Sequence, residues 1–206
     1  MSNISLIIGL GNPGTEYAQT RHNAGFWFVE RLAEQYGITL KNDPKFHGIS
    51  GRGQIEGQDI RLLLPTTFMN RSGQSVVPFA KFYQITPQSM LVAHDELDMN
   101  PGIIRLKTGG GHGGHNGLRD ITPHTGPDFH RLRIGIGHPG SKERVSGHVL
   151  SKAPRSEQEL MDDAISHALS KIKLLVNGEI QQAMNQINAY KPVSYTHLTL
   201  PTKRIV

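Results

Sequence analysis

Apolar, β-branched runs alternate along this chain with segments whose apolar residues recur every three or four positions. The runs predict strands over Ile4–Leu10, Gly48–Ile55 (the weakest pattern), Ile60–Leu64, Met90–Ala93, Ile103–Lys107 and Leu132–Ile136. The periodic segments predict helices over Phe26–Tyr36, Ser72–Phe82, a short Gly117–Ile121, Glu157–Val176 and Glu179–Ala189. Strands interleaved with helices favour an α/β fold, so we expect a single-domain three-layer sandwich around one central β-sheet flanked by helices.

The spacing of the strands predicts that this sheet is mixed, although mainly parallel. Parallel neighbours need a long crossover, and the strands within residues 48–64 and within residues 90–107 follow each other too closely for one.

Local signals place the ends of the last helices and of the domain. Ser156 followed by Glu159 has the pattern of a capping box at the start of the fourth helix, and Asn177-Gly178 separates it from the fifth. The tail Pro192–Val206 has neither period, and a proline cannot continue a helix. We therefore expect one domain over residues 1–191 and a dispensable tail over residues 192–206.

Composition narrows the class of protein. A chain of 206 residues suits one domain with a substantial core, and the lack of cysteine excludes disulfides, thiolate metal sites and a cysteine nucleophile. No signal peptide and no apolar run of membrane-spanning length is recognisable, so we expect a soluble cytoplasmic protein. A net charge of +5 is compatible with nucleic-acid binding but does not establish it.

The loop after the first strand concentrates polar side chains. Asn12, Tyr17, Arg21, His22 and Asn23 all follow that strand closely, and loops at the carboxyl ends of strands build the active sites of α/β proteins.

The same loop contains a weak dinucleotide-binding pattern. Residues Gly9 to Gly14 fit G-x-G-x-x-G, which would make the protein an NAD(P)-dependent oxidoreductase. A true fingerprint opens a helix, whereas Pro13 interrupts this loop and the first convincing helix begins near Phe26. We favour a tight turn that brings Asn12 and His22 to one rim.

A second rim position follows the strand that begins at Met90. Asp95 at the end of this strand would pair with His22, fix its tautomer and raise its basicity, as a general base near neutral pH requires. The alternative, that Asp95 and Glu96 merely cap a turn before Pro101, has equal support from spacing.

The segment Pro65–Gly73, reading PTTFMNRSG, closes another strand and enters a helix. Asn70 would present its amide to a substrate carbonyl, although Asn70 or Ser72 would equally serve as a helix cap. Ser72 is not an obvious nucleophile, because the G-x-S-x-G motif is absent.

The glycine-rich stretch Gly109–Gly117, reading GGGHGGHNG, has the composition of a mobile lid over a ligand. Its two histidines also suggest a metal site, and the candidate ligands are His22, His94, Asp95, His112 and His115. Since no H-E-x-x-H or comparable motif supports a metal, we expect none.

Basic residues gather in sequence around this stretch: Arg105, Lys107, Arg131, Arg133, Lys142 and Arg144. Arg131 and Arg133 alternate along one strand, so they would grip a phosphate together if the others surround them. Otherwise they are ordinary solvated charges.

The motifs GLGNPGTEYAQTRHNAG, PTTFMNRSG, VAHDELD, GGGHGGHNGLRD and FHRLRIGIGHPG together closely resemble bacterial peptidyl-tRNA hydrolase. The likeness runs in order from about Ile4 to Tyr190. The resemblance implies a monomeric α/β enzyme without a cofactor, and without an obligate protein or membrane partner, that hydrolyses the ester joining a peptide to the 3′ ribose of tRNA. Its partner is then the acceptor arm and 3′ end of peptidyl-tRNA.

The resemblance also implies roles for individual residues. His22 would be the general base and Asp95 its orienting partner. The peptide and ester site would be lined by Asn12, Met69, Asn70 and Asn116, with Tyr17 near the tRNA terminus. Lys107 and Arg133 match the family's phosphate-gripping positions, supported by Arg105 and Lys142.

The residues suit this chemistry, because one base for water and amide donors for the oxyanion suffice to cleave an ester. The main rival is a non-hydrolytic RNA-binding member of the same fold, similar to the family's plant splicing factors. Intact His22, Asp95, Asn70 and Asn116 weigh against it.

Overall fold

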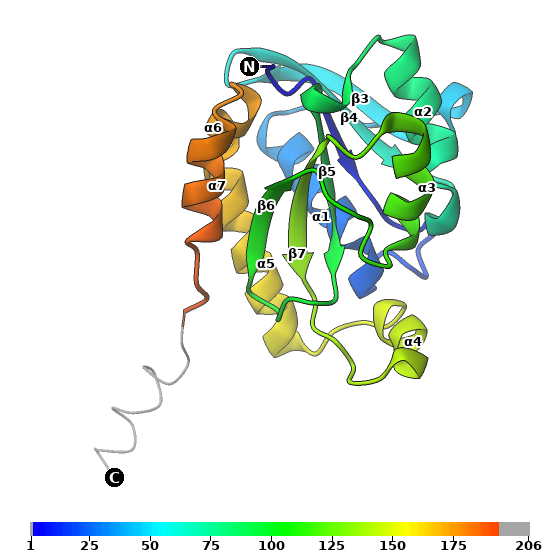
Figure 1. The fold of residues 1–206 in the computed structure, drawn as a ribbon, viewed down its shortest axis with the longest axis vertical. Helices are drawn as coiled ribbons and strands as arrows, with labels where there is room; N and C mark the ends of the chain where they lie inside the picture. The colour runs from blue at the N-terminus through cyan, green and yellow to red at the C-terminus, as the bar shows by residue number, and fades with distance from the viewer. Residues whose placement is uncertain (1, 194–206) are drawn as a thin grey trace.

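A computed structural model describes residues 2–193 of the chain. One seven-stranded sheet has the strand order β2-β3-β4-β1-β5-β7-β6 (Figure 1). The strands are β1 Leu6–Gly9, β2 Lys41–Asp43, β3 Gly48–Ile55, β4 Gln58–Pro65, β5 Met90–Glu96, β6 Ile104–Thr108 and β7 His130–Gly135. The adjacent strands β4, β1, β5 and β7 are mutually parallel, whereas β3 and β6 run antiparallel to their neighbours.

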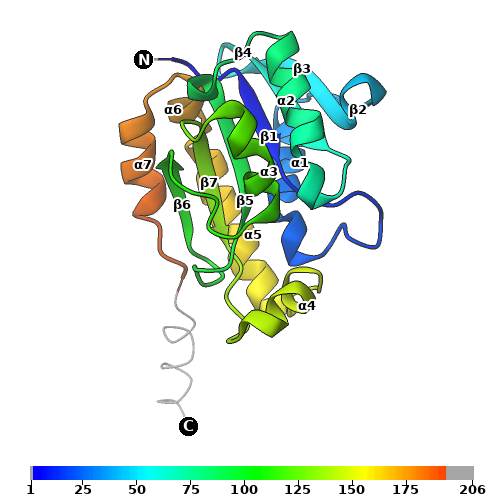
Figure 2. The same ribbon diagram turned by 45° about the vertical axis from the view of Figure 1, so that its right-hand side comes forward.

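Helices cover both faces of this sheet (Figures 1 and 2). The helices are α1 Ala24–Gln35, α2 Gly73–Phe82, α3 Asn116–Thr125, α4 Val145–Val149, α5 Arg155–Ser170, α6 Ile172–Val176 and α7 Ile180–Asn188. Short 3-10 turns are η1 Arg21–Asn23, η2 Pro44–Phe46, η3 Met69–Arg71, η4 Pro87–Ser89 and η5 Lys142–Arg144. Buried residues of α1, α5, α6 and α7 form one core with the sheet, and those of α2 and α3 form a second core on its other face.

The predicted α/β sandwich with a mixed sheet is confirmed. The closely spaced strands β3 and β4 form an antiparallel hairpin, as their spacing predicted. The second closely spaced pair is different, because β7 lies between β5 and β6 and supplies the antiparallel partner of β6. Sequence spacing shows that β6 cannot run parallel beside β5, but it does not show which strand enters between them.

Two short elements were not predicted, and one cap was predicted wrongly. β2 has three residues and α4 has five, which is too few to display a period. Ser156 does not cap a helix. The backbone amides of Glu157 and Gln158 donate to the carbonyl of Pro154 at 3.0 and 2.9 Å, so α5 starts two residues earlier than the capping box requires.

The long helix predicted over residues 157–176 divides at Lys171 into α5 and α6, and Asn177-Gly178 ends α6 as expected. Within residues 2–193, no helix is long and apolar enough to span a lipid bilayer. Of the predicted tail, residues 194–206 lie outside the part of the chain that the structure describes.

Candidate active site

A cavity of about 580 Å³ opens at the carboxyl ends of β1, β4 and β5. Of the predicted site residues, Asn12, His22, Met69, Asn70, Asp95, Asn116 and Lys142 line it. A cavity of similar volume, about 600 Å³, lies beside β2 and β3 and contains none of the predicted site residues. The chemistry predicted from sequence therefore converges on the first cavity.

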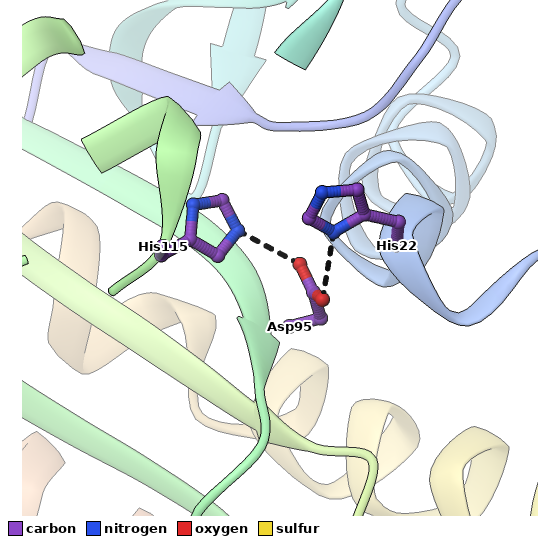
Figure 3. A group of neighbouring side chains, drawn as sticks. All are labelled: His22, Asp95 and His115. Carbon is purple, nitrogen blue, oxygen red and sulfur yellow. Dashed lines mark hydrogen bonds and ion pairs between the residues drawn. The ribbon is translucent and has the colours of Figure 1, made fainter. Parts of the chain in front are cut away.

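His22 and Asp95 are in direct contact, as predicted. Nδ1 of His22, on η1, lies 2.8 Å from Oδ2 of Asp95 at the end of β5 (Figure 3). The other carboxylate oxygen, Oδ1, lies 2.8 Å from Nε2 of His115, which immediately precedes α3. Asp95 is thus held between two imidazoles, of which the sequence predicted only one.

The surrounding hydrogen bonds define which nitrogens carry hydrogen. Nδ1 of His115 accepts from the backbone amides of Gly117 and Leu118 at 3.1 and 3.4 Å, so its Nε2 must donate to Asp95. The carboxylate of Asp95 accepts from Nδ1 of His22 in the same way. Neutral His22 consequently keeps an unprotonated Nε2.

The environment raises the pKa of His22 above its ordinary value. Burial lowers the pKa, but the charge and the hydrogen bond of Asp95 together outweigh burial. For Asp95, burial favours the neutral acid, yet the two histidines lower its pKa well below the usual range. Asp95 is therefore ionised at neutral pH, and it favours the protonated form of His22, whose pKa is raised.

His94, the residue before Asp95, contacts both Asp95 and His115. It is buried, its Nδ1 donates to the carbonyl of Asp95 at 2.8 Å, and its ring packs edge-on against His115 with centroids 5.0 Å apart. Burial, with a smaller effect of His115, lowers the pKa of His94 to about 3, so this histidine is neutral.

Asn12 is fixed as part of the framework of the cavity. Its side-chain Oδ1 accepts from the backbone amide of Met69 at 2.8 Å. Its own backbone amide and carbonyl bond to the side chain of Asn23, both at 2.9 Å. The bond to Met69 joins the loop after β1 to η3, and it leaves the side-chain amide nitrogen of Asn12 as a donor.

Asn70 and Asn116 bring two further amides to the cavity, and both are exposed. Oδ1 of Asn116 accepts from Arg119 at 3.2 Å, which leaves its amide nitrogen as a donor. Neither Asn70 nor Ser72 caps α2 through its side chain, because Ser72 occupies the cap position but donates to the carbonyl of Met69 at 2.7 Å.

Tyr17 lies outside the lining of the cavity, but near its mouth. Its ring meets that of Phe68 edge-on, with centroids 6.3 Å apart, and Phe68 lines the cavity with a residue exposure of 57%. Sequence reasoning missed Phe68, because only its exposure distinguishes it from a core phenylalanine.

Four of the six predicted basic residues lie on β6 and β7, whereas Lys142 and Arg144 lie on η5. Arg105 pairs with Arg133, and Lys107 with Arg131, so all four side chains lie on the same face of the sheet. Three of them, Lys107, Arg131 and Arg133, line a smaller cavity of about 210 Å³. This cavity adjoins the first one through Glu96 and Gly113, which line both. Lys142 lines the larger cavity instead.

The idea that Arg131 and Arg133 grip a phosphate together is wrong for Arg131. Arg131 is buried, and its guanidinium donates to the carbonyls of Gly110, Gly111 and Pro127. It anchors the glycine-rich stretch. Arg133 is half-buried, and its Nε pairs with Glu96 at 3.0 Å, so its two terminal nitrogens stay available.

The glycines of the first loop serve packing. A Cβ on Gly9 would lie 2.3 Å from the carbonyl oxygen of Gly25, so β1 and α1 approach closely at this point. The helix opens at Ala24, well beyond the G-x-G-x-x-G pattern. In a dinucleotide-binding fingerprint the helix opens within the pattern, so this loop does not have that arrangement.

Among the described residues, His22, Asp95 and His115 form the group whose ligand atoms lie within 4.8 Å of one another, as a metal site requires. Both imidazole nitrogens that face Asp95 donate hydrogen to it, and the amides on Nδ1 of His115 fix that arrangement. A cation would have to replace both hydrogens. His112 faces the smaller cavity, and its Nδ1 accepts from Gly114 at 2.9 Å.

Comparisons with known proteins identify similar chains. A family model described as peptidyl-tRNA hydrolase matches residues 6–195. A curated peptidyl-tRNA hydrolase of Acinetobacter baumannii (strain AYE) is 84% identical over 192 residues, covering 93% of this chain and 100% of that protein. One of Psychrobacter cryohalolentis is 65% identical over 188 residues, covering 91% and 97%. A crystal structure of peptidyl-tRNA hydrolase from Acinetobacter baumannii matches with a TM-score of 0.93 and 83% identity, covering 94% of this chain and 98% of that one.

Proposed function

The chain belongs to the peptidyl-tRNA hydrolase family, and from this membership we propose that His22 activates the water that cleaves peptidyl-tRNA. The enzyme hydrolyses the ester bond between peptide and tRNA and releases free tRNA. The rival function, RNA binding without hydrolysis, is not favoured by high identity to curated hydrolases.

The contact that supports this mechanism best is the 2.8 Å hydrogen bond between Nδ1 of His22 and Asp95. It leaves Nε2 of His22 free to take a proton from water while the water oxygen attacks the ester carbon. The tetrahedral intermediate then breaks the bond to the ribose oxygen, which receives the proton from His22. The products are the tRNA hydroxyl and the peptide carboxylic acid, which releases its proton to solvent and leaves as the carboxylate.

The amide groups suit the remaining roles. Asn12 and Asn116 each have their carbonyl oxygen engaged within the protein, so their amide nitrogens are the groups that face substrate. Donors of this kind stabilise the oxyanion of an acyl-transfer intermediate. Asn70 and Met69 complete the wall against which the peptide and ester lie.

The basic face of β6 and β7 supplies affinity for the tRNA acceptor arm. Lys107 and the free edge of Arg133 contact phosphates, with Arg105 and Lys142 as supporting charges, and Tyr17 lies near the tRNA terminus. Phosphate contacts of this type tolerate many sequences, which suits an enzyme that acts on many peptidyl-tRNAs. We propose that the enzyme acts as a monomer, in the cytoplasm, without an obligate protein partner.

The test is release of free tRNA from peptidyl-tRNA by the purified protein, with and without EDTA. We expect release under both conditions. Binding of peptidyl-tRNA without release would restore the RNA-binding rival.

A further inference from the structure

One wall of the active-site cavity is built by α4, a helix of only five residues. α4 contributes Val145 and Val149, followed by Leu150, and Leu97 adds a fourth apolar side chain to the lining. A helix of five residues cannot maintain itself, because helices this short are unstable without tertiary contacts. The position of this wall therefore depends on what holds α4.

Two side chains hold it, and both act near the C-terminal end of α4. Nε2 of His148 donates to the carbonyls of Ile136 and Gly137, at 3.2 and 2.9 Å, and fastens α4 to the chain that leads from β7. From the other side, Nη1 of Arg21 lies 3.0 Å from the carbonyl of His148 and 2.6 Å from Oγ of Ser151.

The backbone of Arg21 also connects the residues after α4 to η1, the turn that carries His22. Its amide donates to the carbonyl of Ser151 at 3.1 Å, and Thr20 bridges to Lys152 beside it. The residue is 7% exposed, and Oε1 of Glu157 lies 3.9 Å from its Nη2. A buried guanidinium loses its hydration, so its hydrogen bonds through Nη1 to the end of the α4 segment matter all the more, because its Nε has no partner among the described residues.

We infer that Arg21 is a positioning residue that fixes the α4 wall, and that this wall receives the side chain of the amino acid esterified to tRNA. The inference rests on the proposed function, because Nε2 of His22 marks where the ester carbon must lie. The asparagine amides serve the peptide backbone, and the apolar surface of α4 and Leu97 remains for the side chain.

The chain offers a matched control in Arg31. Its guanidinium makes the same kind of contacts, to the carbonyl of Asp162 at 3.0 Å and to the hydroxyl of Ser166, and these join α1 to α5 away from the active-site cavity. The experiment compares Arg21→Gln, Arg21→Lys and Arg31→Gln on two substrates. One is tRNA carrying N-acetyl-leucine, and the other is tRNA carrying N-acetyl-glycine.

We expect Arg21→Gln to raise KM for the leucine substrate about tenfold and KM for the glycine substrate less than about threefold, because only leucine reaches the wall. Both kcat and the midpoint of its pH dependence stay unchanged, since His22 and Asp95 are intact. Arg21→Lys retains a cationic donor and recovers most of the affinity. Arg31→Gln behaves like the wild type on both substrates.

Equal losses on the two substrates, or losses no larger than those of Arg31→Gln, would overturn the inference in favour of a purely structural role. A shifted midpoint of the pH dependence would also overturn the inference, because it would show that Arg21 acts on the ionisation of His22. If Arg21→Gln fails to fold, Ser151→Ala removes the closest acceptor of Arg21, and it must change the leucine preference in the same direction. Failure of the proposed function is seen separately, as full activity of a His22 variant.

Discussion

At the scale of single residues, the site depends on Asp95 accepting two hydrogen bonds at once. The sequence predicted the pairing with His22, because a strand end and a rim loop place them together. It did not predict His115 as the second partner, since a histidine in a glycine-rich stretch equally suggests a lid or a metal ligand. Only the turn into α3, whose amides occupy Nδ1 of His115, directs the other nitrogen to Asp95.

Replacing Asp95 by Asn should slow hydrolysis by about tenfold or more, yet less than loss of His22. An amide has one acceptor oxygen for two imidazole donors, so either His22 or His115 loses its partner. Because Asp95 raises the pKa of His22, the acid limb of the kcat/KM profile should move to lower pH in this variant. An unchanged rate and an unchanged profile would show that the pair does not act in catalysis.

Chelation provides a second test at this scale. EDTA should leave turnover unchanged, because the two imidazole nitrogens that would bind a cation already donate to Asp95. The measurement is the initial rate before and after dialysis against the chelator. Loss of activity that zinc or magnesium restores would establish the histidine group as a metal site.

At the scale of elements, the alternation of charge along β6 and β7 predicted a basic face, and the register of the two strands produces it. The alternation could not predict how deeply each of these side chains is buried. Arg131 lies on the same face of the sheet as Arg133, but the glycine-rich stretch covers and buries it. Arg131 therefore holds that stretch in place, although it is the same type of residue as Arg133.

Replacing Lys107 or Arg133 by Ala should raise KM for peptidyl-tRNA and reduce the slope of its salt dependence by about one unit for each phosphate that the variant no longer neutralises. A short ester substrate without the tRNA body should be nearly unaffected. Arg155→Ala is a suitable control, because this arginine is exposed on α5 and pairs with Glu159. Equal loss on both substrates would place Lys107 and Arg133 in the ester site or in folding.

At the scale of the whole molecule, hydrophobic periodicity predicted the sandwich, most strand positions and the mixed sheet. It missed β2, which forms by pairing with β3, and α4, which is held by contacts of Arg21 and His148. α4 supplies a wall of the active site, so the unpredicted part of the fold is also part of the functional cavity.

Truncation after Lys191 should leave both the melting temperature and hydrolysis unchanged, within the roughly ±0.5 kcal/mol typical of changes away from packed features. The last helix within residues 2–193, α7, ends at Asn188, and the truncated chain retains every described residue of both cores. Thermal unfolding and tRNA release measure the two properties. A melting temperature lower by several degrees would show that the tail contributes to stability. Weaker tRNA binding than the loss of two basic residues explains would show that it contributes to binding.

The central claim is that His22 removes the proton from the attacking water. Single-turnover hydrolysis of peptidyl-tRNA by His22→Ala tests it most directly, with tRNA binding and thermal unfolding measured on the same sample. We predict a folded protein that binds peptidyl-tRNA and cleaves it about 10²–10⁴-fold more slowly, the usual contribution of a general base. A variant that cleaves within about threefold of the wild-type rate would contradict this role, because loss of a general base should slow the reaction far more.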